Sequence, residues 1–378
     1  MREATDKIFI IAGEASGDLH ASNLVKEIKK IKPGTEFTGV GGKNLKEQGV
    51  KLVSNYSRVN YIGFTSVARH LPEIKKVLND CVESVKHNTP DIVILVDFPG
   101  FNLKFAEKIR KFYTGKIIYY ISPQLWAWHK SRVKKIREFI DKMLVVFPFE
   151  VEFYKNEGVE AQFVGHPLVE IIDGFLKNNR KQDFEKKQIG LLPGSREEEI
   201  RKILPVILEA GNKLKNEFDA DLNLICSSNI DKKVYEDIIG SSAGNIIFTG
   251  AEEGLYYRTL LNSDVLFAKT GTSTMECTLI GSPYCVVYRA NILNYFIGRM
   301  LIQVDHIAMA NILMGKEIVK EFIQSQMNVE NLYSEGKRIL TDTNYKDTML
   351  ANFKRVREIL TDRSASRTAA EIVCGYLK

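Results

Sequence analysis

Short, nearly uninterrupted runs of β-branched and aromatic residues recur along this chain, separated by stretches with helical periodicity. In the first half they are KIFIIA (7–12), DIVILVD (91–97), KIIYYIS (116–122) and KMLVVF (142–147). Strands with this composition are buried on both faces, as parallel strands between layers of helices are. The pattern therefore predicts an α/β fold built on a parallel sheet.

A second series of strands follows a polar segment. Its members are IGLLPGS (189–195), DLNLICS (221–227), NIIFTG (245–250), DVLFAKTGT (264–272) and PYCVVYR (283–289). A chain of 378 residues is longer than one core usually supports, so we expect two doubly wound halves with a cleft between them.

The expected boundaries follow from changes in composition. We expect a first domain over 1–168, a polar linker over 169–188 and a second domain over 189–345, with the helices of 346–378 packing back towards the first domain. From about residue 291 the periodicity is mostly helical, including EIVKEFI (317–323).

Charge is unevenly divided between the two halves. The net charge is +6, and residues 1–165 carry 26 Lys and Arg against 19 Asp and Glu. This basic half is either a solvated surface or a surface that meets anionic lipid or a phosphate-bearing substrate. The five cysteines lack paired spacing, which favours a reducing cytoplasm, and no apolar run approaches the roughly 20 residues that span a bilayer.

The loop GEASGD (13–18) follows the first strand, where a dinucleotide-binding loop would lie. Its glycine spacing differs from that fingerprint, and Glu14 and Asp18 would repel a phosphate. The small residues Gly13, Ser16 and Gly17 allow a sugar to approach closely. We expect the two carboxylates to contact sugar hydroxyls or to brace the loop, and bracing is the favoured role for Asp18.

The loop LLPGSREEEI (191–200) opens the second half and suits a diphosphate. Gly194 and Ser195 expose backbone N–H groups at a helix start, and Arg196 adds a guanidinium fork. The alternative is an ordinary helix start with Ser195 as its N-cap.

A later loop, AKTGTSTMEC (268–277), repeats this strand-to-helix geometry. Gly271 allows close backbone approach, and Thr270, Thr272 and Ser273 offer hydrogen-bond donors. Glu276 can accept from the hydroxyls of a ribose, and the alternative is an exposed acid in a first helical turn. Together the two loops predict a nucleoside diphosphate site.

Asp97 ends a strand in LVDFPGFN (95–102), at the sheet edge where open α/β folds bind ligands. Such a carboxylate suits a general base that acts on a hydroxyl. The alternative is that Asp97 only accepts hydrogen bonds from loop N–H groups.

The segment SPQLWAWHKSRVKKIR (122–137) combines aromatic and basic residues. Trp126 and Trp128 precede a cationic stretch that contains Lys130, Arg132, Lys134 and Lys135. Aromatics beside a cationic helix suit a lipid–water boundary or a sugar platform, and the alternative is a pair of core tryptophans. The segment 61–78 has a similar character. Neither resembles a base-reading motif, so we expect no nucleic-acid partner.

The histidines are not spaced as metal ligands, because neither HxxxH nor HExxH occurs. We therefore expect no catalytic metal and no cofactor. His166 in VGHPL is expected to bond locally at the turn between domains, and Asn311 in MANILMGKE is expected to be a helix cap or a cleft residue.

These motifs, in this order from residue 7 to about 325, resemble the lipid-A-disaccharide synthase family. The resemblance implies a GT-B architecture, with two Rossmann-like doubly wound domains facing a central cleft. It implies that the second domain binds UDP-2,3-diacylglucosamine and that the first binds 2,3-diacylglucosamine 1-phosphate. The implied reaction forms a β(1→6) disaccharide and releases UDP.

The resemblance also implies roles for individual residues. Asp97 would deprotonate the acceptor 6-hydroxyl, Arg196 and the two loops would stabilise the leaving UDP in place of a metal, and Glu276 would hold the ribose. Asn311 resembles the family's cleft asparagine near the reacting groups. The basic half would lie on the anionic inner face of the inner membrane, with 61–78 guiding acyl chains, and a homodimer is one candidate assembly.

Two residues depart from the family pattern. His129 stands where relatives have arginine, and Lys269 has no assigned role. The alternatives are another metal-independent GT-B UDP-sugar transferase, a UDP-sugar epimerase, or a peripheral lipid-binding protein. The last would explain the basic aromatic surface but not the diphosphate and ribose loops.

Overall fold

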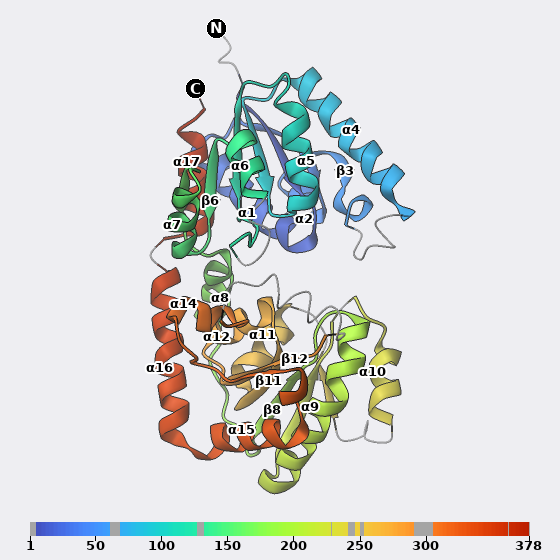
Figure 1. Ribbon diagram of the computed structural model, residues 1–378, viewed down its shortest axis with the longest axis vertical. Helices are drawn as coiled ribbons and strands as arrows, with labels where there is room; N and C mark the ends of the chain where they lie inside the picture. Colours follow the sequence, from blue (N-terminus) through green and yellow to red (C-terminus); the bar gives the residue numbers. More distant parts are fainter. Residues whose placement is uncertain are drawn as a thin grey trace. The chain divides into compact units, whose positions relative to one another are not determined.

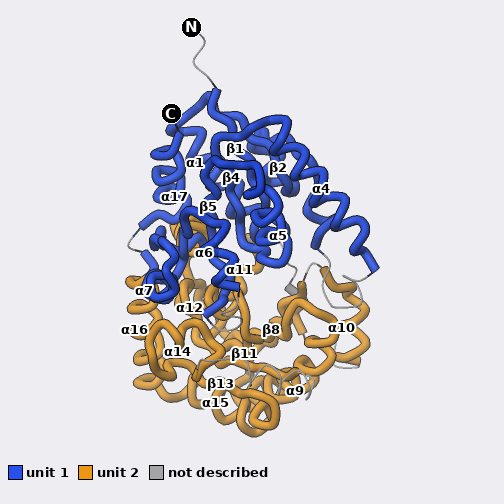
Figure 2. The backbone as a smooth tube through the Cα atoms, turned by 45° about the horizontal axis from the view of Figure 1, so that its top comes forward, with its two compact units in different colours: residues 1–167, 360–378 blue, residues 168–359 orange. Residues whose placement is uncertain are grey.

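The computed structural model of this chain describes residues 5–60, 69–126, 132–227, 229–240, 246–249, 253–290, 305–361 and 363–377. The chain forms two compact units, coloured separately in Figure 2. The first contains residues 1–167 and 360–378, and the second contains residues 168–359.

The first unit is built on a parallel sheet of seven strands in the order β3-β2-β1-β4-β5-β6-β7. Figure 1 shows this sheet among the helices of the unit. The strands are β1 (Lys7–Ala12), β2 (Glu36–Gly41), β3 (Lys51–Asn55), β4 (Ile92–Val96), β5 (Lys116–Tyr120), β6 (Lys142–Val145) and β7 (Ala161–Phe163). The α-helices of this unit are α1 (Ala15–Ile31), α2 (Lys43–Glu47), α4 (Leu71–Asn88), α5 (Pro99–Ile109), α6 (Val133–Phe139), α7 (Pro148–Asn156) and α17 (Ala365–Cys374), and a 3-10 turn η1 (Tyr56–Arg58) follows β3.

Successive side chains of β1 point into two different cores, which explains why this sheet needs helices on both faces. Phe9 and Ile11 pack into a core shared with α4 and α5, whereas Ile8 and Ile10 pack into a second core shared with α1 and α17. All four side chains are buried, and so is every residue of β4. The strands that are apolar on both faces are therefore covered by helices on both faces of the sheet.

The second unit repeats this topology in a six-stranded parallel sheet with the order β10-β9-β8-β11-β12-β13. Its strands are β8 (Gln188–Leu192), β9 (Asp221–Ile225), β10 (Ile246–Thr249), β11 (Val265–Lys269), β12 (Tyr284–Tyr288) and β13 (Glu321–Ile323). Its helices are α8 (Pro167–Asn178), α9 (Glu197–Phe218), α10 (Lys232–Ile239), α11 (Glu253–Asn262), α12 (Thr272–Ile280), α14 (Met309–Met314), α15 (Val329–Thr341) and α16 (Thr343–Leu360), with a 3-10 turn η4 (Gln324–Gln326).

The prediction of two Rossmann-like α/β domains is confirmed, and each of the nine predicted strands is present. One element was predicted wrongly. EIVKEFI (317–323) has helical periodicity, but residues 321–323 form β13, which pairs in parallel with β12. Pairing with a neighbouring strand here overrides a weak local preference.

The boundaries between the two units lie at the start of α8 and at the end of α16, before α17. The segment 169–188, expected as a linker, contains most of α8. After residue 345, α16 belongs to the second unit, whereas α17 belongs to the first unit and packs against α1.

Strand order reverses next to β1 and next to β8, and these are the topological switch points where open α/β sheets bind ligands. In the first unit Ala12 pairs with Val96, so the chain leaves β1 and β4 at neighbouring positions. In the second unit Leu192 pairs with Ala268, so the chain leaves β8 and β11 side by side. The loops at residues 13–18, 97–102, 193–196 and 269–273 begin at these four strand ends.

Candidate functional site

A pocket of about 360 Å³ lies at the switch point of the second unit. It is lined by side chains and backbone from the ends of β8, β9 and β11, together with the starts of α11 and α12. These residues are Leu192, Gly194, Ser195, Ile225, Cys226, Ser227, Tyr256, Lys269, Thr270, Gly271, Thr272, Ser273 and Glu276. The structure therefore brings together predicted nucleotide residues of two separate loops, except Arg196, which follows Ser195 but does not line the pocket.

The first wall of this pocket is the turn from β8 into α9. Gly194 has φ of +118°, a conformation that favours glycine. Arg196 occupies the N-cap of α9 and makes no side-chain cap hydrogen bond, so the alternative of a Ser195 cap is not formed. The first N–H groups of a helix without such a cap, together with the positive end of the helix dipole, favour an anion.

The guanidinium of Arg196 stands at the same turn. Its side chain is 61% exposed, and its Nη1 lies 3.4 Å from Oε1 of Glu199 in the first turn of α9. This exposed and weakly held fork can turn to bind a phosphate.

The opposite wall is the start of α12. Gly271 has φ of +151°, and the Thr274 hydroxyl donates to the Gly271 carbonyl over 2.7 Å. The hydroxyl of Thr270 donates to the Ile307 carbonyl, and that of Ser273 to the Lys269 carbonyl. These two hydroxyls therefore shape the loop, and Thr272 is the exposed hydroxyl among the predicted donors.

Glu276 is held at the pocket by two tyrosines of α11. The hydroxyl of Tyr256 donates to its Oε2 over 2.5 Å, and the hydroxyl of Tyr257 donates to its Oε1 over 3.1 Å. Burial and the neighbouring carboxylate raise the pKa of Tyr256 well above its usual value, so it stays a donor. A carboxylate oxygen can accept more than one hydrogen bond, so an acid at this place in the pocket suits a pair of ligand hydroxyls.

Several pocket residues were not identified from the sequence. Tyr256, Cys226 and Ser227 lie in segments with no recognised motif, although Cys226 and Ser227 directly follow β9. The position of these two residues at a strand end adjacent to β8 was the available signal.

Asp97 occupies the corresponding switch point of the first unit. It follows β4 with φ of +44°, and Phe98 follows with φ of +49°, both unusual for residues other than glycine. Two side chains hold this turn, because the hydroxyl of Tyr119 donates to the Asp97 carbonyl over 2.5 Å and the amide of Asn102 donates to it over 2.6 Å. Backbone strain fixed in this way is typical of functional positions.

The carboxylate of Glu14 lies beside that of Asp97, because the two follow neighbouring strands. Burial, and then the charge of Glu14, raise the pKa of Asp97 to about 7. Gly13 makes this juxtaposition possible, since a Cβ there would lie 2.1 Å from the ring of Phe98. A carboxyl group with such a pKa can accept a proton near neutral pH.

Asp18 braces the opening loop. It is buried, and its carboxylate accepts from the backbone N–H groups of Gly42, Asn44 and Leu45 at 2.6, 3.0 and 3.3 Å. These bonds tie α1 to the start of α2. Ser16, by contrast, donates to Oε1 of Glu14 over 2.7 Å and supports that side chain.

His166 is buried in the first unit, and the half-buried His20 lies near it. Burial lowers the pKa of His20 to about 4, and burial together with His20 lowers the pKa of His166 to about 3. His166 also packs against the ring of Phe147, with centroids 5.0 Å apart. Both rings are therefore neutral at physiological pH, in keeping with a local role for His166.

The comparisons with known proteins cover the whole chain. The family described as lipid-A-disaccharide synthetase matches residues 8–373. A lipid-A-disaccharide synthase of Nitrosococcus oceani is 37% identical over 100% of this chain and 98% of its own length. One of Geobacter metallireducens is 36% identical over 98% of this chain and 97% of its own. The chain belongs to the lipid-A-disaccharide synthetase family.

Solved structures add evidence on the fold of this family member. A putative UDP-N-acetylglucosamine 2-epimerase from Listeria monocytogenes has a TM-score of 0.67 at 14% identity, covering 99% of this chain and 96% of that one. The calicheamicin glycosyltransferase CalG4 has a TM-score of 0.64 at 13% identity, covering 99% and 98%. At such identities the likeness concerns architecture, and it agrees with the predicted GT-B pair of domains.

For Asn311 the structure corrects the predicted role among the reacting groups. The residue is 0% exposed, and its amide nitrogen donates to the Val319 carbonyl and to Oε1 of Glu321. Its amide oxygen accepts from the N–H groups of Ile318 and Val319. Because its hydrogen-bonding capacity is used inside the unit, this family asparagine fixes the path from α14 to β13.

Trp126 requires a similar correction. It is 9% exposed, its indole N–H donates to Oε1 of Glu150 over 3.2 Å, and its ring stands edge-on to Phe149. Trp126 is therefore a core residue and not a surface anchor. Glu150 is itself buried, and burial raises its pKa to about 7.

The other predicted surface residues divide into two groups. Arg132, Lys134 and Lys135 are exposed at or near the start of α6, and Lys135 pairs with Glu107 over 2.7 Å. Trp128, Lys130 and His129 lie outside the described residues, as does part of the segment 61–78.

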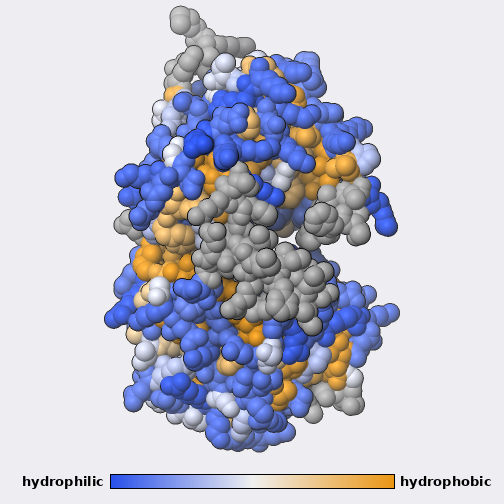
Figure 3. All heavy atoms as spheres, viewed as in Figure 1, coloured by the Kyte–Doolittle hydropathy of each residue, from blue (hydrophilic) through white to orange (hydrophobic). Residues whose placement is uncertain are grey.

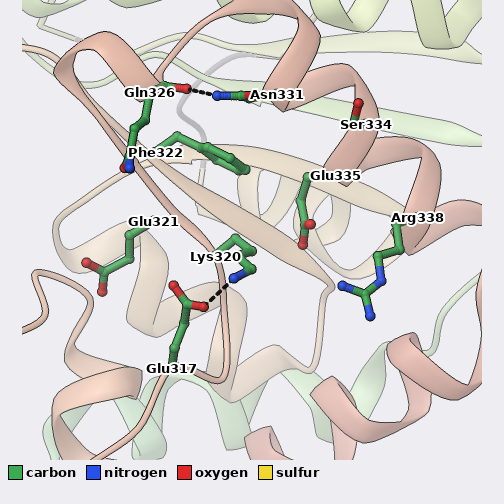
Figure 4. Close-up of a pocket in the computed structure, with 9 residues that line it drawn as sticks. All are labelled: Glu317, Lys320, Glu321, Phe322, Gln326, Asn331, Ser334, Glu335 and Arg338. Atoms are coloured by element: carbon green, nitrogen blue, oxygen red, sulfur yellow. Dashed lines mark hydrogen bonds and ion pairs between the residues drawn. The ribbon is translucent and has the colours of Figure 1, made fainter.

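A pocket of about 420 Å³ on the edge strand β13 is larger than the pocket at the switch point (Figure 4). Its polar groups are paired within the unit. Lys320 bonds to Glu317 over 2.5 Å and the amide of Asn331 donates to the Gln326 carbonyl, while Glu335 accepts from Tyr345 outside the lining. It shares no lining residue with the pocket at the switch point. Chemistry rather than size therefore selects the smaller pocket as the candidate site.

Two further observations concern the described part of the chain. No group of three or more His, Cys, Asp or Glu side chains within these ranges is arranged to hold a metal ion. None of the helices in the same ranges is long and apolar enough to cross a membrane.

Proposed function

We propose that this chain is a lipid-A-disaccharide synthase that transfers 2,3-diacylglucosamine from its UDP derivative to 2,3-diacylglucosamine 1-phosphate. Membership of the family over residues 8–373 carries this proposal. The two switch-point sites support it, because one combines anion-binding and ribose-binding groups and the other presents a carboxyl group with a raised pKa.

On the donor side, we assign the diphosphate to the turn at Gly194, Ser195 and Arg196 and the ribose to Glu276. The bond that breaks joins the anomeric carbon of the donor sugar to the β-phosphate oxygen, and its electron pair leaves with UDP. The N–H groups at the start of α9 and the guanidinium of Arg196 would stabilise the growing negative charge.

On the acceptor side, Asp97 is the proposed general base. It takes the proton from the acceptor 6-hydroxyl while that oxygen attacks the anomeric carbon from the face opposite UDP, which inverts the configuration. Burial, and then the charge of Glu14 beside it, keep the pKa of Asp97 high enough for this proton transfer.

Titration calorimetry with UDP tests the donor site. We expect saturable binding with one site per chain, and an absence of binding would contradict the transferase. The alternative of a UDP-sugar epimerase is tested by incubation with UDP-N-acetylglucosamine. We expect no 2-epimer to form, and its formation would favour that alternative.

The assignment of Glu276 predicts a loss of ribose recognition. Glu276→Gln should weaken UDP binding about 10- to 100-fold, because the neutral amide is a poorer acceptor for two hydroxyls. The variant should bind UDP and 2′,3′-dideoxy-UDP with similar affinity, whereas the wild type should prefer UDP. An unchanged preference in the variant would remove Glu276 from the ribose site, and Glu236→Gln on the surface of α10 is the matched control.

Peripheral association with an anionic inner membrane is a further proposal. Hydrophilic atoms cover most of the visible surface of the first unit, with smaller hydrophobic areas between them (Figure 3). Lys134 and Lys135 are exposed on α6, and Leu71 and Phe112 are exposed apolar residues of the same unit. Basic and apolar groups together favour binding to anionic lipid.

Charge reversal tests this surface. Lys134→Glu with Lys135→Glu should weaken binding to vesicles containing phosphatidylglycerol about tenfold or more at low salt, and the difference should shrink as salt rises. Lys43→Glu with Lys46→Glu on α2 changes the charge by the same amount and serves as the control. Equal effects of the two double variants would indicate a general charge effect instead of a binding surface. A homodimer remains a prediction that sedimentation can test.

A further inference from the structure

Lys269 is the last residue of β11 and lines the nucleotide pocket. Its side chain is 19% exposed, and its Nζ lies 3.1 Å from Oε1 of Glu199 in the first turn of α9. The same carboxylate oxygen lies 3.4 Å from Nη1 of Arg196. Lys269 in the pocket and Arg196 at the adjacent turn therefore share one acid.

Glu199 is an unexpected residue to find under a phosphate-binding turn. Its side chain is 15% exposed, and within the described residues its Oε2 is buried without a hydrogen-bond partner. A Cβ on Gly194 would lie 2.9 Å from this oxygen and 3.5 Å from Cδ of Lys269, so the turn passes directly over the pair. The dipole of α9 stabilises the carboxylate, but its charge would repel a diphosphate bound at the same turn.

We propose that Lys269 is a diphosphate-binding residue that neutralises Glu199 and presents its ammonium group to the phosphates of the nucleotide. This inference rests on the proposed function, because it concerns the same UDP site. An ammonium group has three donors, so Lys269 can keep its bond to Glu199 and still donate to a phosphate oxygen.

The arrangement explains how Arg196 stays available for the ligand. Without Lys269, Glu199 would have Arg196 as its sole cationic partner among those described at the pocket, and the carboxylate would hold the guanidinium away from the phosphates. With Lys269 present, the three groups carry one net positive charge before the nucleotide binds. The competing explanation is that the pair only fastens β11 to α9, which would make it structural.

Binding of UDP and of uridine separates the two explanations, because uridine lacks phosphates. Lys269→Met should raise the Kd for UDP about tenfold or more and change the Kd for uridine less than twofold. Lys269→Arg should stay within about threefold of the wild type for UDP. The double variant Glu199→Gln with Lys269→Met should recover only part of the lost UDP affinity, because it removes the repulsion by Glu199 but does not restore the missing donor to the phosphates.

Lys202→Met is the matched control, because Lys202 pairs with Glu198 one turn further along α9 and does not line the pocket. It should leave both affinities unchanged. Equal losses for UDP and uridine in Lys269→Met, or no loss at all, would overturn the inference. If Lys269→Met fails to fold, the Lys269→Arg variant and the double variant are compared instead. The deciding quantity is again the change in Kd for UDP relative to the change in Kd for uridine. A wild type that does not bind UDP would instead contradict the proposed function.

Discussion

Asp97→Asn is expected to lower turnover by about 10³-fold, because the amide cannot accept the proton of the attacking hydroxyl. The affinity for UDP should stay within about twofold, since the nucleotide is assigned to the pocket of the second unit. Turnover is measured as release of UDP with saturating acceptor. Binding of UDP is measured on the same preparation, so that a folding defect is recognised.

The pH profile gives this prediction a second readout. A general base works only when deprotonated, and the pKa of Asp97 is raised to about 7. Turnover should therefore fall about tenfold per pH unit below 7 and level off above it. Glu14→Gln removes the neighbouring charge, which lowers the pKa of Asp97 and should shift the midpoint to lower pH. Because burial is the larger cause of the raised pKa, the shift should be partial.

Asp91→Asn is the matched control, because Asp91 precedes β4 at the end opposite Asp97 and accepts from the backbone N–H of Lys7. This variant can lose stability, but its pH profile should match that of the wild type. Substantial turnover by Asp97→Asn would remove Asp97 from the role of base.

Arg196→Ala should lower kcat/KM by about 10²- to 10³-fold, the range found when a donor aimed at developing charge is removed. The guanidinium stands at the uncapped start of α9, where the leaving phosphate oxygens are assigned. The loss should appear mainly in kcat if Arg196 acts on the leaving group, and in KM if it only holds the diphosphate in the ground state.

Arg201→Ala is the control for this experiment. Arg201 lies on the same helix and pairs with Glu197 over 2.8 Å, so its removal takes away a similar charge outside the pocket. If Arg196→Ala lowered kcat/KM by less than about threefold, the effect would be no larger than that of a surface charge change. This result would contradict the assignment of Arg196 to the leaving phosphate.

The strands and the two switch-point loops could be predicted from the sequence because their signals are local. A run such as IVILV is apolar throughout, and the residues that follow it must leave the sheet at a known edge. This reasoning places Asp97, Arg196 and Glu276 at the strand ends and helix starts of the two sheet edges. It does not require knowledge of which strands are neighbours.

What the sequence did not reveal depends on contacts between distant segments. The end of EIVKEFI forms a strand because it pairs with β12. Asn311 is buried because its amide oxygen accepts from the backbone N–H groups of residues 318 and 319. Trp126 donates a hydrogen bond to Glu150, which is 24 residues away, and its ring packs against Phe149. A role for Lys269 follows only from its ion pair with Glu199, which lies in the first turn of α9 and is distant in the sequence.

Incubation of the protein with UDP-2,3-diacylglucosamine and 2,3-diacylglucosamine 1-phosphate tests the central claim most directly, with the products identified by mass spectrometry. We predict equal amounts of UDP and of a tetraacylated disaccharide 1-phosphate, with a β(1→6) linkage established by NMR. Both products should be absent when Asp97→Asn replaces the wild type under the same conditions. Formation of no disaccharide by wild-type protein that is folded and binds UDP would contradict the proposed function.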